Sequence, residues 1–301
     1  MRPGRSAAGA GFVFLSSGSA FLIIGTVFFI FALICKGGCG TLSWEFIFSP
    51  PRSGMTEGGI FPAIIGTFML VFIMSIIGVP VGTVTALFLS EYVKRSSLIA
   101  GTVRFAVNTL AGIPSIVFGL FGLGFFVQFV GRNMDRAFSP PGELVWGQPC
   151  LLWAGLTMAL LTLPTVIVVV EEAIAAVPRE LREASLALGA TRWETITRIV
   201  LPNSLTGILT GAILAVSRGA GEVAPLLFTG VAYFLPSIPH RLSDQFMQLG
   251  YHVFVMATQS TNVEKTLGIQ YATTLVLLLL TFMLNFTAII LRFQLRKRSR
   301  V

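Results

Sequence analysis

The sequence predicts an all-α integral membrane protein with six transmembrane helices. Its composition is 54% hydrophobic and only 11% charged, whereas soluble domains carry about 25% charged residues. Apolar runs of about 20 residues, the length that crosses a bilayer as a helix, recur along the whole chain. The short segments of alternating polarity that are typical of a membrane β-barrel do not occur in it.

Six segments are long and apolar enough to span a membrane. The first exceeds the apolar core of a signal peptide, so we expect a retained helix. The second, third and fifth exceed the required length, which predicts tilt, a break or a surface extension. We expect an N-terminal helix and extracytoplasmic loop at 1–59 and a five-helix core at 60–301. The six segments are 12–34, 60–90, 103–130, 151–177, 203–235 and 271–292.

Basic residues are concentrated at the two termini and in alternate connections between the predicted helices. The positive-inside rule therefore places both termini of this multi-pass protein in the cytoplasm. Because the charge flanks helices instead of covering a soluble face, it indicates contact with anionic membrane lipid and not with nucleic acid. These stretches hold 14 of the 21 basic residues: Arg2, Arg5, Lys94, Arg95, Arg104, Arg179, Arg182, Arg192, Arg198, Arg292, Arg296, Lys297, Arg298 and Arg300.

Cysteine and histidine usage predicts no metal site and no cofactor. Cys35 and Cys39 follow the first helix in "CKGGC", where a local disulfide and two free thiols both remain open. Cys150 has no obvious partner. No Cys or His set has zinc spacing, and no Walker A sequence occurs. We therefore expect a chain that is not itself an enzyme, with any ATP and Mg bound by a partner ATPase.

The connection at 171–202 predicts a structured helix–turn–helix on the cytoplasmic side. Gly189 suits the C-terminal turn of a first short helix. Thr191 and Glu194 have the spacing of a capping box that starts a second one, and Pro202 suits the start of the next membrane helix. A plain connection needs only a few residues. Two interpretations stay open: a docking surface for a partner, or an amphipathic helix on the bilayer surface.

The stretch "EASLALGATRWETITRIVLP" resembles the EAA loop of ABC-importer permeases. That pattern is E-A-A, three residues, G, nine residues and I-x-L-P, and Ser185 in place of the second Ala is the one departure. The resemblance implies the type I ABC-importer permease architecture and a loop that docks on a cytoplasmic ATPase dimer. The residues of this loop that we expect to couple to the ATPase are Glu183, Ala184, Ser185, Gly189, Ala190, Thr191, Ile199, Leu201 and Pro202.

Three further stretches resemble phosphate-specific permeases of the PstA type. They are "GGIFPAIIGTF" at 58–68, "NTLAGIPSIVFGLFGLGFF" at 108–126 and "SRGAGEVAPLLFTG" at 217–230. This resemblance implies a protein of the bacterial inner (plasma) membrane that imports inorganic phosphate into the cytoplasm. It also implies three partners: a PstB-like ATPase dimer, a second, PstC-like permease subunit and a periplasmic phosphate-binding protein.

The stretch "SRGAGEVAPLL" places charges inside a long apolar run. Arg218 and Glu222 are four residues apart, so on a helix they would share a face and pair. A charge in the middle of a bilayer costs about 2.5–3.5 kcal/mol and is by default a functional hypothesis. Arginine binds phosphate through two parallel hydrogen bonds, so we expect Arg218, Glu222 and Ser217 along the substrate pathway. A buried ion pair that only braces the helices is the alternative.

The third predicted helix contributes Asn108 and Ser115 as weaker pathway candidates beside Pro114, which frees a backbone carbonyl. Interhelical hydrogen bonding is the alternative for both. Glu171 and Glu172 are expected to be solvated. The stretch 243–260 is expected to begin with a cap at Ser243 or Asp244 and to form either a helix along the outer surface or a re-entrant packing element.

Other functions remain possible on this sequence. Permeases for another oxyanion, such as sulfate or molybdate, carry the same loop. An ion-coupled secondary transporter or channel would also contain intramembrane charges, but it would need no EAA-spaced loop. An intramembrane hydrolase would need a base near Ser115 or Ser217, and both histidines lie elsewhere in the sequence.

Overall fold

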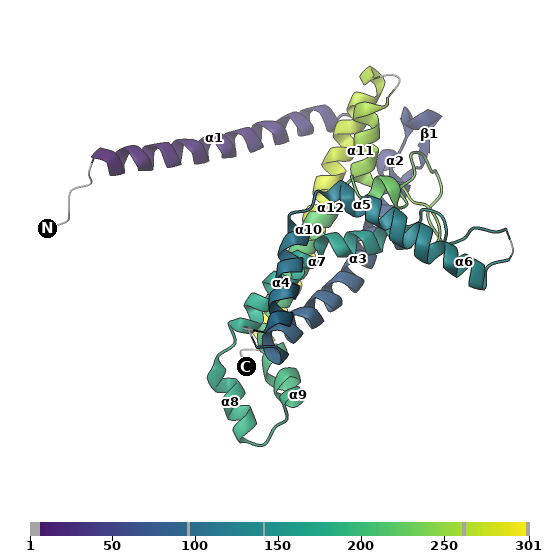
Figure 1. Ribbon diagram of the computed structural model, residues 1–301. Coiled ribbons are helices and arrows are strands. Elements are labelled where there is room, and N and C mark those ends of the chain that lie inside the picture. Colours follow the sequence, from purple (N-terminus) through teal and green to yellow (C-terminus); the bar gives the residue numbers. More distant parts are fainter. Residues whose placement is uncertain (1–6, 95–96, 141, 261–262, 299–301) are drawn as a thin grey trace.

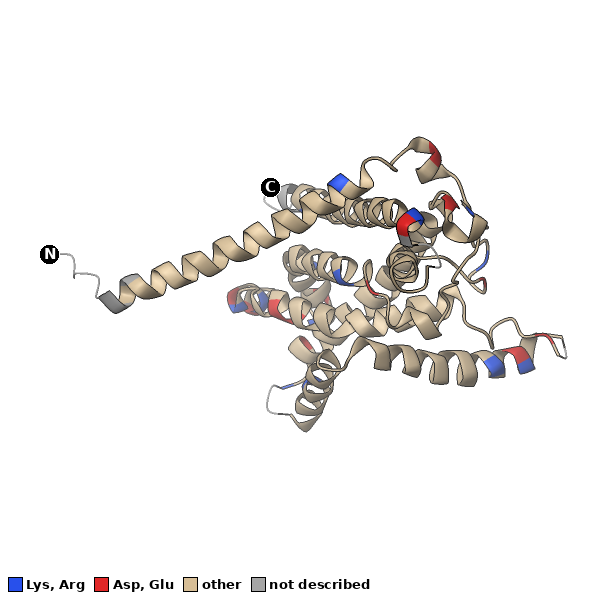
Figure 2. Ribbon diagram, turned by 90° about the horizontal axis from the view of Figure 1, so that it is seen from above, with Lys and Arg blue, Asp and Glu red and all other residues tan. Residues whose placement is uncertain are grey.

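The computed structural model describes residues 7–94, 97–140, 142–260 and 263–298 of the 301-residue chain. Within these residues six helices are long and apolar enough to cross a membrane, which confirms the predicted fold class. Charged residues gather at the ends of the long helices and in the connections between them (Figure 2). The six spans are Gly11–Gly38, Phe61–Tyr92, Ser115–Phe138, Leu151–Ala175, Arg192–Gly219 and Glu264–Gln294.

Three helices form the centre of the bundle: α3 (Phe61–Leu87), α7 (Leu151–Ala175) and α10 (Leu201–Gly219). Both of the others pack on α7, which is the most buried of the spans. The last helix, α12 (Val263–Arg298), packs along α10 and α11 (Leu249–Thr258). Figure 1 shows α3, α7 and α10 side by side, running from α8 and α9 at one end to α11 at the other.

Small residues allow the central helices to approach closely, as is common where helices pack inside a membrane. A Cβ atom on Gly82 of α3 would fall 2.6 Å from Val166 Cγ1 of α7. A Cβ atom on Gly207 of α10 would fall 2.0 Å from Ala173 Cβ of α7. Neither interface has room for an additional methyl group, so these contacts fix the distances between α7 and its two neighbours.

The N-terminal helix, α1 (Ala7–Gly38), extends away from the bundle (Figure 1). Its C-terminal end packs on α12, where Gly37 and Gly38 lie against Tyr271 and Ala272. Between Gly11 and Leu33 its described side chains are exposed in this chain. A short layer follows: α2 (Trp44–Phe48), the two-residue antiparallel strands β1 (Pro51–Arg52) and β2 (Glu57–Gly58), and η1 (Ser53–Met55) between them.

The third predicted span, 103–130, has the wrong beginning. A separate helix, α4 (Leu98–Ala111), ends at Gly112, and the membrane helix starts afresh at Ser115. Pro114 causes this break, because a proline lacks the N–H of a continuing helix and disfavours helical geometry in the residue before it. The new helix consists of α5 (Ser115–Phe121), the π-helical η3 (Gly122–Gly131) and α6 (Arg132–Phe138).

The fifth predicted span, 203–235, is wrong at both ends. The helix begins at Arg192 and is continuous through α9 (Arg192–Thr195), the π-helical η4 (Ile196–Val200) and α10. Pro202 therefore lies inside a continuous helix and does not open one. The helix stops at Gly219, and residues 220–248 are irregular apart from η5 (Leu226–Phe228) and one isolated β-bridge between Val231 and Phe246.

The irregular segment 220–248 packs back onto the first turn of α7. The backbone N–H groups of Cys150, Leu151 and Leu152 donate to the carbonyls of Thr229 (3.0 Å), Asp244 (2.9 Å) and Leu242 (3.0 Å). The first N–H groups of a helix have no partner within it, so this segment supplies the acceptors that α7 lacks. The segment can remain non-helical in an apolar part of the chain because these backbone carbonyls have hydrogen-bond donors in α7.

The stretch 243–260 contains a short helix that packs on α12 and α3. Its helix, α11, starts at Leu249 with Gln248 as the N-cap, and it buries Leu249 and Val255 in the cluster shared with α12. The expected helix cap at Ser243 or Asp244 is wrong. The Asp244 carboxylate instead accepts the backbone N–H groups of Arg241 and His240 in a turn, and these two bonds lower the pKa of Asp244 from its usual value.

The contact between Gly207 and Ala173 gives a first prediction. Gly207→Ala should lower the free energy of unfolding by about 1–3 kcal/mol, because the added methyl group overpacks the α7–α10 interface. Ala173→Gly in the same chain should restore most of the loss by exchanging the two methyl groups. Thermal unfolding of the detergent-solubilised protein measures both effects. Gly101→Ala on α4, where nothing lies within 4 Å, is the control, and equal melting of the Gly207 and Gly101 variants would contradict the interface.

Candidate functional site

Two local motifs build the loop that joins α8 (Arg179–Ala187) to α9, as the sequence predicts. Gly189 has a φ of 86°, a conformation that costs a residue with a side chain. Its N–H donates to Leu186 O and the N–H of Ala190 donates to Ser185 O, which together form a Schellman motif. The Thr191–Glu194 capping box starts α9, with Thr191 N–H donating to Glu194 Oε2 at 2.9 Å.

The tip of the α8–α9 loop carries apolar side chains that no described part of the chain covers. Leu188 is 90% exposed and Trp193 is 65% exposed. Ser185 Oγ and Thr195 Oγ1 lie 3.0 Å apart and join the two short helices, so this surface is held in shape from within. Beside the tip lies an open groove of about 510 Å³, lined by Leu181, Ala184, Ser185, Leu188, Gly189, Ala190, Glu194, Arg198 and Ile199.

The loop residues singled out from the sequence do not all lie on this groove. Glu183 lines a different, polar cavity on the other side of α8. Thr191 is exposed and caps α9. Leu201 and Pro202 lie in α10, beyond the loop. The groove therefore combines five of the nine predicted residues: Ala184, Ser185, Gly189, Ala190 and Ile199.

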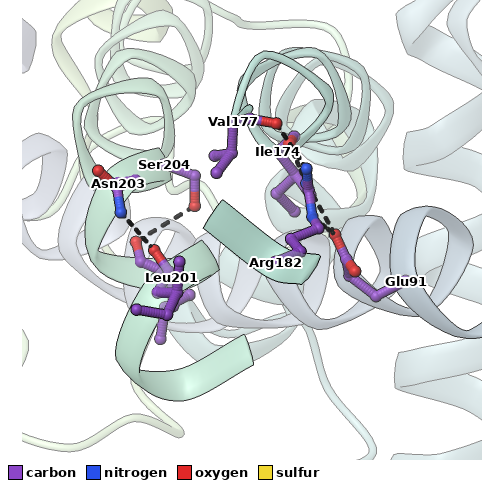
Figure 3. Close-up of polar contacts among 8 residues, drawn as sticks. Glu91, Ile174, Val177, Arg182, Leu201, Asn203 and Ser204 are labelled. Carbon is purple, nitrogen blue, oxygen red and sulfur yellow. Dashed lines mark hydrogen bonds and ion pairs between the residues drawn. The ribbon is translucent and has the colours of Figure 1, made fainter. Parts of the chain in front are cut away.

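Arg182 attaches α8 to the membrane helices, as Figure 3 shows. Its guanidinium donates to the carbonyl of Ile174 (2.7 Å), in the last turn of α7, and to that of Val177, two residues beyond the helix. It also forms an ion pair of 3.0 Å with Glu91. Glu91 lies in η2 (Phe88–Tyr92), the π-helical continuation of α3. The last carbonyls of a helix have no partner within it, so one side chain caps α7 and connects it to α3 and α8.

A second ion pair lies beside the first. Arg104 of α4 donates to Glu171 Oε1 of α7 through Nη2 (2.6 Å) and Nε (3.0 Å). The expectation that Glu171 is solvated is wrong, although Glu172 is exposed. Both pairs line a polar cavity of about 330 Å³ together with Ser90, Ala175, Arg179 and Glu183. The sequence gives no local signal for either pair, since the partners are 67 and 91 residues apart.

The predicted pair of Arg218 with Glu222 does not form. The helix ends at Gly219, so Glu222 lies in the irregular segment and not one turn above Arg218. The structure describes both residues and records no ion pair between them. Gly219 and Ala220 are buried, and Gly219 lies against Met74 of α3. Close approach at these small residues therefore displaces the pair that the sequence suggested.

Arg218 lies at mid-height of the bundle and is exposed in this chain. Its Nη1 donates to Thr165 Oγ1 of α7 at 3.4 Å. Thr165 follows the start of α7 by 14 residues and precedes its end by 10, which is about 21 Å and 15 Å along the axis at 1.5 Å per residue. The neighbouring Ser217 Oγ lies 2.8 Å from Asn285 Oδ1 of α12. A cation at this depth without a carboxylate partner is free to bind an anion.

The two candidates of the third predicted helix do not join Arg218. Asn108 is exposed on α4 and Ser115 is half-buried at the start of α5; the structure records no hydrogen bond between their side chains and Arg218. The segments nevertheless meet, because a Cβ atom on Gly119 of α5 would fall 2.8 Å from Pro225 O. Among the described residues no group of three or more His, Cys, Asp or Glu side chains is placed to hold a metal ion.

The chain is similar to known membrane transport proteins. A family model described as "Binding-protein-dependent transport system inner membrane component" matches residues 78–301. Probable ABC transporter permease protein YqgI of Bacillus subtilis is 35% identical over 66% of this chain and 63% of that protein. Phosphate transport system permease protein PstA of Yersinia pestis is 37% identical over 68% and 64%. PstA 1 of Mycobacterium tuberculosis H37Rv is 32% identical over 81% and 73%. The matches thus span just under two thirds of the first two relatives.

Solved structures of ABC transporters share the fold. A bacterial alginate ABC transporter, solved in complex with an alginate-bound periplasmic protein, matches 92% of this chain and 91% of that chain with a TM-score of 0.64 and 16% identity. The MetNI methionine ABC transporter, in an inward-facing conformation, matches 79% and 94% with a TM-score of 0.52 and 19% identity. These likenesses confirm the expected importer-permease architecture.

The Arg182–Glu91 contact gives a second prediction. Arg182→Gln and Glu91→Gln should each destabilise the protein, and the double variant should be less damaged than the sum of the two. We expect a coupling energy of about 1–2 kcal/mol, between the values of exposed and of buried pairs. Arg182→Gln should cost more than Glu91→Gln, because it also removes the hydrogen bonds from Arg182 to the carbonyls of Ile174 and Val177. Unfolding of the four proteins in detergent measures the cycle.

Exposed Arg192, which forms no recorded ion pair, provides the matched control as Arg192→Gln. Its stability should equal that of the parent protein. Strictly additive losses at Arg182 and Glu91 would show that the two side chains do not interact.

Proposed function

Because this chain belongs to the family of binding-protein-dependent transport system inner membrane components, we propose that it is the membrane-spanning permease subunit of an ATP-driven importer of inorganic phosphate. The observation that carries the proposal is the preformed α8–α9 loop with its uncovered apolar tip. The substrate is inferred from relatives that are named phosphate transport system permease proteins. Sulfate or molybdate is the alternative substrate to be tested.

The α8–α9 loop would dock on a separate ATPase dimer of the PstB type. Leu188 and Trp193 lose their exposure to water if a partner covers them, and buried apolar area is the main source of binding free energy. The Schellman motif and the capping box fix the loop before docking, so little conformational entropy is lost. ATP and Mg would then be bound by the partner, and movement of the loop would reach α7 through Arg182.

Orientation and further partners follow from the same proposal. The α8–α9 loop and both termini would lie in the cytoplasm, in agreement with the distribution of basic residues. The irregular segment 220–248 would face the opposite side, where a periplasmic phosphate-binding protein delivers the anion. A second permease subunit of the PstC type would cover side chains that are exposed here, among them Arg218.

Arg218 would bind the anion inside the membrane. A guanidinium placed within a span costs free energy unless it has a partner, and the structure gives Arg218 a neutral hydroxyl in place of a carboxylate. Guanidinium–phosphate hydrogen bonds are charge-assisted and bidentate. Ser217 on the same helix would add a hydroxyl at this level, while Asn108 and Ser115 stay weaker candidates at the neighbouring α4–α5 break. Glu222 would act near the entrance to the pathway.

Docking of the ATPase gives a third prediction. Leu188→Asp should reduce copurification of the ATPase with the permease at least tenfold and should leave membrane insertion intact, because Leu188 supports nothing in the chain itself. Leu98→Asp is a matched control, since Leu98 is 89% exposed at the start of α4. Equal copurification by the two variants would remove the docking role of the loop.

Anion binding gives a fourth prediction. Arg218→Gln should lower phosphate uptake into proteoliposomes containing the whole complex by about 10- to 100-fold, the range of one charge-assisted hydrogen bond. The amount of assembled complex should not change. Adding Glu222→Gln should not rescue uptake, because the two side chains do not pair. Near-normal phosphate uptake by either variant would exclude Arg218 from the pathway. If the parent complex takes up sulfate or molybdate in preference to phosphate, the proposed substrate is wrong.

A further inference from the structure

Helices α10 and α12 share two polar contacts that recur at the same spacing on both helices. Arg292 Nη1 donates to Thr210 Oγ1 at 3.0 Å. Seven residues away on each helix, Ser217 Oγ lies 2.8 Å from Asn285 Oδ1. The partners are seven residues apart on each helix and run in opposite directions, so the two contacts stack along one antiparallel interface. At 1.5 Å per residue they are separated by about 10 Å.

The charge of Arg292 is more than helix packing requires. Hydroxyl and amide side chains are sufficient to join two helices in a membrane, whereas a guanidinium adds a desolvation cost. No acidic residue occurs between 195 and 221 or between 265 and 301, so neither α10 nor the apolar part of α12 can neutralise it. Among the residues that the structure describes, no carboxylate forms an ion pair with Arg292, which points to a charged ligand.

Arg292 also differs from a simple anchor at the membrane surface. An anchoring arginine extends its side chain toward the lipid headgroups. Arg292 is half-buried, and its side chain donates to Thr210 of α10, which is 82 residues earlier in the sequence. It lies closer than Arg218 to the end of the bundle that carries the α8–α9 loop, since Thr210 precedes Arg218 by eight residues on α10.

We propose that Arg292, with Thr210, Ser217 and Asn285, forms a polar track that carries the anion inward from Arg218. Arg292 would be the second cationic anion-binding residue of the pathway. This inference rests on the proposed function, because it assumes that the chain translocates an oxyanion. Hydroxyl and amide groups both donate and accept hydrogen bonds, and several weak sites in succession allow an ion to enter and to leave.

Cysteine accessibility tests the track without reference to the substrate. In the assembled complex with Cys35, Cys39 and Cys150 changed to Ser, Asn285→Cys should react with a sulfonate-bearing thiol reagent at least tenfold faster than Thr287→Cys. Thr287 is the matched control, because it lies two residues further along α12 and its hydroxyl donates to Met283 O of its own helix. Equal rates at the two positions would overturn the proposal.

Uptake kinetics test the role of the guanidinium. Arg292→Lys keeps the charge but cannot bind an oxyanion bidentately, so KM for phosphate should rise at least threefold with unchanged assembly. A membrane anchor would tolerate lysine, and an unchanged KM would therefore reject the binding role of Arg292. If the unmodified complex imports no phosphate, the proposed function fails. The contrast between Asn285→Cys and Thr287→Cys then still decides whether a water-accessible track exists.

Discussion

The fold depends on how distant segments of the chain supply hydrogen-bond partners to the two ends of α7. Each helix end leaves several backbone groups without a partner inside the helix. At one end the carbonyls of Thr229, Asp244 and Leu242 accept from the first N–H groups of the helix. At the other end Arg182 donates to the carbonyls of Ile174 and Val177. The central helix is therefore held by two segments that are distant from it in sequence.

These two attachments explain why irregular and charged elements occur in so apolar a chain. Three carbonyls of the irregular segment 220–248 accept hydrogen bonds from the start of α7, and Gly219 and Ala220 are buried where the chain changes direction. The Glu91 and Arg104 side chains are tolerated for the same reason, since each meets an opposite charge at the end of a packed helix. These ion pairs lie near the ends of helices. Between the ends, the helices pack tightly at small residues such as Gly82 and Gly207.

Features set by neighbouring residues could be predicted from the sequence, and features set by distant ones could not. The α8–α9 loop follows from the Gly189 turn and the Thr191–Glu194 box, which act within a few residues, and the structure has both. Hydropathy predicts that six spans exist and that the overlong third and fifth ones are tilted, broken or extended, but not that the third breaks at Pro114 or that the fifth ends at Gly219. The pairing of Arg218 with Glu222 assumed a continuous helix, and it fails where tertiary contacts end that helix.

Continuity of one helix connects the two parts of the proposed mechanism. The span from Arg192 to Gly219 begins at the α8–α9 loop and ends one residue after Arg218, so a displacement of the loop would be transmitted along one helix to the proposed anion-binding residue. The π-helical η4 lies between them, where the hydrogen bonding departs from the α-helical pattern. Arg182 holds the neighbouring α7 and α3 to the same loop. Movement of α8 and α9 would therefore act on α3, α7 and α10 together. Because Arg218 lies on α10 and Thr165 on α7, such a movement would change the distance between these two side chains.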